Sequence, residues 1–139
     1  MPCGARMRAV DTNILTRYFR HDDNRQSPAA LQVMADAAVF CPKTVILEFE
    51  WVMRYVYRHG TDDIIRCLGT LLELPNVTIE DEQQVLEAVQ AYQRGMDFAD
   101  ALHLAASRGC EELVTFDGRR FAQRATRLGL EPPVTVPHR

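Results

Sequence analysis

Lysine is nearly absent from this sequence. Of its 16 basic residues only Lys43 is a lysine, and the others are arginines. Arginine has a planar guanidinium group that can hold a phosphate through two hydrogen bonds, although genomic base composition explains such a bias equally well. The formal net charge is only −3, so the strongly basic character of many nucleic-acid-binding proteins is also missing. The positions of the arginines therefore say more than their number.

Two other absences narrow the class of protein. The four cysteines are widely spaced, with no C-x-x-C pair and no histidine at ligand spacing, which argues against a zinc site or a disulfide framework and favours a reducing, cytoplasmic location. No apolar run approaches the roughly 20 residues of a membrane span. The first seven residues also lack the apolar stretch of a signal peptide. We expect residues 1–6 to be a disordered extension, with Met7 as an alternative start.

The hydropathy pattern predicts alternating strands and helices. With 139 residues, 47% of them hydrophobic, and no linker or repeat, we expect a single domain spanning 1–139. Alternation of this kind favours an α/β fold with helices on both faces of a parallel sheet, that is, three layers. Strands are expected at 7–10, 38–41, 77–79, 113–115 and 134–136. Helices are expected at 12–19, 27–37, 44–58, 61–73, 81–93, 97–107 and 119–128.

Asp11 directly follows the first predicted strand. Open α/β sheets bind ligands at the carboxyl ends of their strands. Thr12 is predicted to cap the following helix, which would leave the Asp11 carboxylate available as a metal ligand.

The predicted helix 44–58 contains two glutamates, and the helical period places them on different faces. At about 100° per residue, Glu48 shares an apolar face with Val45, Phe49, Val52 and Val56. A carboxylate on such a face needs a cation, because burying it unpaired is costly. Glu50 is predicted on the opposite, solvated side, where it can pair with Arg54 four residues later. We therefore expect Glu50→Gln to be nearly silent.

The helix at 97–107 is apolar almost all round, so its two aspartates must share a narrow polar stripe. Asp97 is equally well explained as the helix N-cap. Asp100, one turn into the helix, has no such explanation and is the stronger candidate ligand. His103 is better explained as a partly buried histidine with a local partner than as a ligand.

Asp117 follows the fourth predicted strand as Asp11 follows the first. In the strand order 3-2-1-4-5, the first and fourth strands are neighbours and the connections diverge between them. A crevice opens at such a point, and Asp11 and Asp117 would flank it.

Several carboxylates in one place cannot all stay ionised unaided: either some take up protons, with raised pKa values, or a cation neutralises them. Two of them about 4 Å apart repel by roughly 4 kcal/mol at an effective dielectric constant of 20. An all-oxygen cluster favours Mg²⁺ or Mn²⁺ over Zn²⁺, and such an ion supports phosphoryl chemistry. Asn13 and Thr115 could hold water or a ligand oxygen beside it. A rim of arginines, chiefly Arg119, Arg120 and Arg124, could contact phosphates, although solvated arginines on a helix are common.

Taken together, the motifs resemble those of the PIN-domain ribonucleases, and among them the VapC-type toxins of bacterial toxin–antitoxin pairs. The matching stretches are Ala9-Val-Asp11-Thr-Asn13, Val45-Ile-Leu-Glu48, Asp97-Phe-Ala-Asp100-Ala-Leu and Val114-Thr-Phe-Asp117, in the family's order. The resemblance implies that Asp11, Glu48, Asp100 and Asp117 bind Mg²⁺ or Mn²⁺, with Asp97 less regular. It also implies endonucleolytic cleavage of structured RNA, homodimerisation, and inhibition by a VapB-like antitoxin.

Three alternatives share parts of this pattern. A receiver domain would need a lysine late in the chain, and a haloacid-dehalogenase-like phosphatase would need an acid where Asn13 stands. A catalytically silent RNA- or protein-binding module with the same fold is the more serious alternative. The presence of all four acids argues against it.

Overall fold

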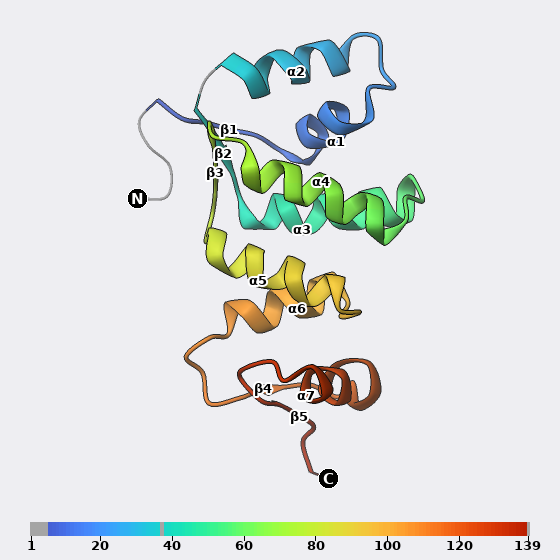
Figure 1. Ribbon diagram of the computed structural model, residues 1–139, viewed down its shortest axis with the longest axis vertical. Coiled ribbons are helices and arrows are strands. Elements are labelled where there is room, and N and C mark those ends of the chain that lie inside the picture. The colour runs from blue at the N-terminus through green and yellow to red at the C-terminus, as the bar shows by residue number, and fades with distance from the viewer. Residues whose placement is uncertain (1–5, 37, 139) are drawn as a thin grey trace. The chain divides into compact units, whose positions relative to one another are not determined.

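The computed structural model describes residues 6–36 and 38–138. The extension expected at residues 1–6 therefore lies almost entirely outside the described residues, as does Ala37, the predicted end of the second helix. Strands and helices alternate along the chain (Figure 1), which confirms the α/β class. The chain forms two compact units, Met1–Glu82 and Gln83–Arg139.

The first unit contains a three-stranded parallel sheet. Strands β1 (Arg8–Ala9), β2 (Val39–Cys41) and β3 (Val77–Ile79) pair in the order β1-β2-β3. Arg8 stands opposite Val39, and Val39 opposite Val77. Parallel neighbours need long crossover connections, and helices supply them here.

The described residues of this unit also form helices, which Figure 1 labels, and a π-helical segment that continues one of them. They are α1 (Thr12–Arg20), α2 (Gln26–Asp36), α3 (Lys43–Trp51), η1 (Val52–Val56) and α4 (Thr61–Glu73). Their apolar faces bury Leu15, Ile46, Phe49, Ile64 and Leu68 almost completely. This burial of large side chains holds α1, α3 and α4 in the unit.

The predicted face of α3 is wrong. The buried positions are Ile46, Phe49, Glu50 and Met53, whereas Glu48 is exposed. Apolar residues lie on several sides of this helix, so the pattern is compatible with two faces. The buried positions keep the spacing i, i+3, i+4 and i+7 of one helical face, which is the face that the prediction did not choose.

The second unit is built around α5 (Glu82–Gln93) and α6 (Phe98–Ala106), which are followed by β4 (Leu113–Val114), η2 (Gly118–Gln123), α7 (Arg124–Leu128) and β5 (Val134–Thr135). Strands β4 and β5 pair in parallel, with Leu113 opposite Val134. The unit buries a compact apolar set that includes Val85, Met96, Phe98 and Phe121.

The predicted five strands are all present, but a single sheet in the order 3-2-1-4-5 is not confirmed. Among the described residues the strands form one sheet of three and one of two. Strands β1 and β4, whose pairing would join the sheets, are each only two residues long. No helix in the described part of the chain is long and apolar enough to cross a membrane.

Candidate functional site

Asp11 lies two residues after the first strand and directly before the first helix. Its backbone is extended, and its Oδ1 accepts a hydrogen bond of 3.1 Å from the backbone N–H of Ile14. Asp11 is therefore the N-cap of α1, and the prediction that Thr12 caps this helix is wrong. A negative charge here is favoured by the positive end of the helix dipole. The cap uses one carboxylate oxygen, and the other can still bind a cation.

Thr12 has a different role. Its side chain is buried, and its hydroxyl donates a hydrogen bond to Oε1 of Glu48 on α3. The sequence offered no sign of this contact, because Thr12 and Glu48 are 36 positions apart. The hydrogen bond orients the Glu48 carboxylate, which is exposed and not buried as predicted.

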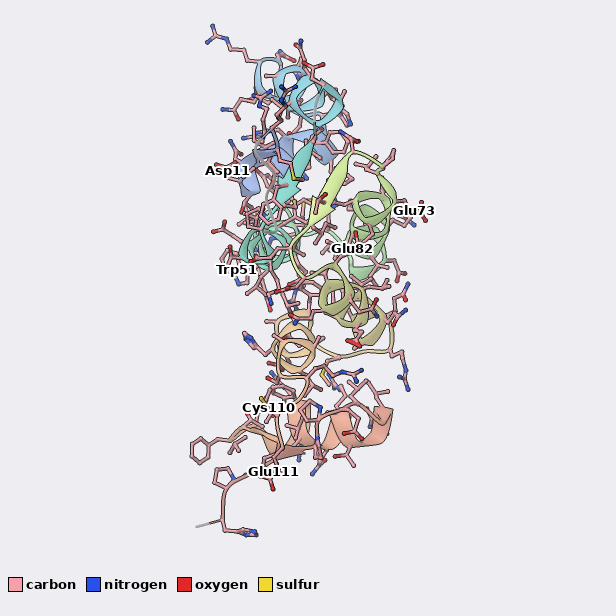
Figure 2. All side chains as sticks on the ribbon, turned by 90° about the vertical axis from the view of Figure 1, so that its left-hand side faces the viewer. Asp11, Trp51, Glu73, Glu82, Cys110 and Glu111 are labelled. Atoms are coloured by element: carbon pink, nitrogen blue, oxygen red, sulfur yellow. The ribbon has the colours of Figure 1, made fainter. Side chains whose placement is uncertain are left out.

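Asp11 and Glu48 line the same hollow of about 320 Å³, together with Thr12, Asn13, Thr16, Val52 and Tyr57. Asn13, a predicted supporting residue, thus lies at the hollow, and its side-chain amide also donates to Oε1 of Gln26 at 3.4 Å. Two carboxylates and an amide therefore face one space within the first unit. Figure 2 labels Asp11, together with Trp51 at the end of α3.

Glu50, predicted to be solvated, is almost fully buried, with 1% of its surface exposed. The predicted pairing with Arg54 is present: Arg54 Nε lies 2.7 Å from Oε2, and Nη2 lies 3.3 Å from Oε1. A guanidinium bound through two nitrogens compensates the buried charge. The prediction that Glu50 is solvated is wrong, and from its buried ion pair we now expect Glu50→Gln to reduce the stability of the fold.

The aspartates of the second unit influence one another. Asp97 is the N-cap of α6, since its Oδ2 accepts from the backbone N–H of Asp100 at 3.1 Å. Burial raises the pKa of Asp100, and the negative charges of Asp97 and Asp117 raise it further, against the opposing effects of His103 and Arg124. The like charges would be relieved by a cation.

Asp117 follows β4 and begins η2. Its Oδ1 accepts from the backbone N–H of Arg120 at 2.8 Å, while its own N–H donates to Oγ1 of Thr115 at 3.1 Å. Thr115, the other predicted supporting residue, therefore fixes the turn that presents Asp117. Asp117 has the same position in its unit as Asp11 has in the first, after a strand and at a helix N-terminus.

The three arginines predicted at the rim differ in their surroundings. Arg119 and Arg120 are exposed at the start of η2. Arg124 is half-buried, and its Nη1 donates to the backbone oxygen of Gly95 at 2.9 Å. Arg124 therefore also ties α7 to the connection between α5 and α6.

The donor set fits a hard divalent ion. Asp11, Asp97 and Asp117 each accept a backbone N–H through one oxygen, and Glu48 accepts the Thr12 hydroxyl, so all four carboxylates are held in orientation. Within residues 6–36 and 38–138, no three or more histidine, cysteine, aspartate or glutamate side chains lie close enough together to hold a metal ion. Mg²⁺ does not require three such ligands, because it is commonly bound through one or two carboxylates and keeps several waters.

The PIN domain family matches residues 8–126. The chain belongs to the PIN domain family. PIN domains are generally metal-dependent nucleases, and the matched region contains every acid discussed above. No curated protein matches the chain. The family predicted from the sequence is confirmed. The match identifies the PIN domain and does not distinguish the VapC subgroup within it.

Proposed function

We propose that this PIN domain is an Mg²⁺- or Mn²⁺-dependent endoribonuclease of the VapC toxin type. The observation that carries the proposal is the pair of carboxylates at one hollow, Asp11 just after β1 and Glu48 held by the hydroxyl of Thr12. An orienting hydroxyl on an exposed glutamate has no evident value for folding, but it is the arrangement that metal ligands commonly need.

The proposed ligands are Asp11, Glu48, Asp100 and Asp117. Asp97, Asn13 and Thr115 support them, and the raised pKa of Asp100 is consistent with a site that gains from a cation. The bound ion supplies Lewis-acid activation of water and of the phosphate group. The proposed fold is a single PIN domain with the strands in the order 3-2-1-4-5.

The reaction is hydrolysis of a phosphodiester bond. A water oxygen forms a bond to phosphorus, the bond to the leaving ribose oxygen breaks, and a proton goes to that oxygen. Asp11 and Glu48 are held for this step by the Ile14 N–H and the Thr12 hydroxyl. Arg119, Arg120 and Arg124 contact the phosphates of a structured RNA substrate.

The proposed partners follow from the same assignment. A cognate VapB-like antitoxin neutralises the toxin in the cytoplasm, and the protein forms a homodimer. Support comes from an aromatic surface in the first unit, where Trp51 and Tyr55 are about half exposed and their rings lie 5.5 Å apart. Exposed aromatic pairs are enriched at protein interfaces.

RNA cleavage with and without Mg²⁺ tests the proposal. Asp11→Asn and Glu48→Gln should abolish cleavage, while both proteins remain folded. Asp62→Asn is the matched control, because Asp62 is an exposed aspartate in the first turn of α4, away from the hollow. Full activity in both site variants would exclude the proposed mechanism. A folded wild type with no metal-dependent activity on any RNA class would instead favour the silent binding module.

A further inference from the structure

A second, larger hollow in the first unit is lined by both apolar and polar side chains, and none of the proposed metal ligands lines it. It measures about 560 Å³ and lies between α1, the end of η1 and α4. Phe19 and Met53 form apolar parts of its lining, and Arg20, His59, Arg66 and Thr70 line it with polar groups. A small-ligand site has this composition and size.

Arg20 is held in place from three sides. Its guanidinium forms an ion pair with Asp22 at 2.8 Å, lies 3.8 Å over the ring of Tyr57, and has Nη1 2.6 Å from Nε2 of His59. Because arginine can only donate, Nε2 of His59 is the acceptor in this contact. The group is therefore pre-organised, which lowers the entropic cost of binding an anion.

The second hollow adjoins the hollow of the acids. Tyr57 lines the hollow of Asp11 and Glu48, while Arg20, stacked on the same ring, lines the larger one. The stacked pair thus forms a wall common to both spaces. A nucleic-acid strand placed with one phosphate beside Asp11 can continue over this wall.

We propose that the larger hollow is a nucleotide subsite, which binds the RNA residue next to the cleaved phosphate. The proposal rests on the proposed function. The base packs on Phe19, and the adjoining phosphate contacts Arg20 and Arg66. Arg20 is paired with Asp22, and Arg66 is paired with Asp63, so a phosphate binds here by taking the place of an aspartate.

Arg66 can reach a phosphate at little cost. It forms an ion pair with Asp63, but both side chains are largely exposed, at 74% and 50%. Such surface pairs contribute little to stability. Arg66 can therefore exchange Asp63 for a phosphate without disturbing α4.

The test measures binding of a short, labelled single-stranded RNA by fluorescence anisotropy in EDTA, where metal-dependent cleavage cannot occur. Arg66→Ala should weaken binding roughly fivefold to tenfold. It should also reduce the slope of log K against log salt by about 0.7, the value for one lost contact to single-stranded nucleic acid. Thr70→Trp should fill the hollow and weaken binding at least as much.

Arg108→Ala is the matched control. Arg108 is also an exposed arginine in an ion pair, with Glu87 at 2.8 Å, but it belongs to the second unit and lies outside the proposed subsite. Its loss should leave both the affinity and the salt slope unchanged. Circular dichroism checks that each variant is folded.

The outcomes separate this inference from the proposed function. Suppose that the wild type cleaves RNA and that Asp11→Asn does not. If Arg66→Ala and Thr70→Trp then bind RNA as tightly as Arg108→Ala, the subsite is wrong, and the proposed nuclease activity is retained. The larger hollow would then be open to a protein partner. If the wild type neither binds nor cleaves RNA, both proposals fail together.

Discussion

Glu50→Gln should destabilise the protein strongly, although the substitution keeps the shape of the side chain. Glu50 is 1% exposed, and its two oxygens lie 2.7 and 3.3 Å from nitrogens of Arg54. Glutamine removes the negative charge that faces the Arg54 guanidinium. Breaking a fully buried pair costs about 3–5 kcal/mol. Because the Arg54 side chain is 25% exposed, we expect a loss of about 2–4 kcal/mol.

Thermal unfolding followed by circular dichroism measures this loss. For a chain of this size, 1 kcal/mol corresponds to roughly 3 °C, so Tm should fall by roughly 6–12 °C. Glu48→Gln is the control two residues earlier on the same helix, and it should change stability by less than about 1 kcal/mol, because Glu48 is exposed. A Tm for Glu50→Gln within about 2 °C of the wild type would refute the structural role of the pair.

Three further predictions concern the acids. Asp11→Asn should abolish RNA cleavage but keep the cap of α1, whereas Asp11→Ala should abolish cleavage and also lose about 1 kcal/mol of stability in urea unfolding. Equal stabilities of the two variants would contradict the cap. Thr12→Val should weaken Mn²⁺ binding about tenfold by calorimetry and Thr12→Ser should restore it, because only the hydroxyl holds Glu48. The raised pKa of Asp100 means that its ionised form is disfavoured in the folded protein, so stability is lost as pH rises above the ordinary value of 3.8. Asp100→Asn should therefore raise Tm in EDTA near pH 7 but not near pH 3, and an equal change at both would contradict the burial of the carboxyl.

The boundaries of most elements could be predicted because local residues determine them. Helix α4 and strand β3 have the expected bounds, since Gly60 precedes the helix and Pro75 lies between helix and strand. The family was also predictable, because its motifs are short stretches in a fixed order.

The roles of neighbouring residues were less predictable, because contacts distant in sequence decide them. By local sequence alone, Thr12 is as good an N-cap as Asp11. In the folded protein the Thr12 hydroxyl donates to Glu48, which packing brings close, and Asp11 caps the helix instead. The interchange of Glu48 and Glu50 has a similar origin. A buried glutamate is acceptable once Arg54 compensates its charge, and the helix has apolar residues on more than one side, so hydropathy alone does not choose the buried face.

Mn²⁺ titration of the ¹⁵N-labelled protein tests most directly the proposal that Asp11 and Glu48 bind a divalent ion. Paramagnetic broadening should be strongest at the amides around Asp11, Thr12 and Glu48, and Asp11→Asn should weaken it there. Broadening that is no stronger at these amides than elsewhere in the first unit, or that Asp11→Asn leaves unchanged, would contradict the proposed site.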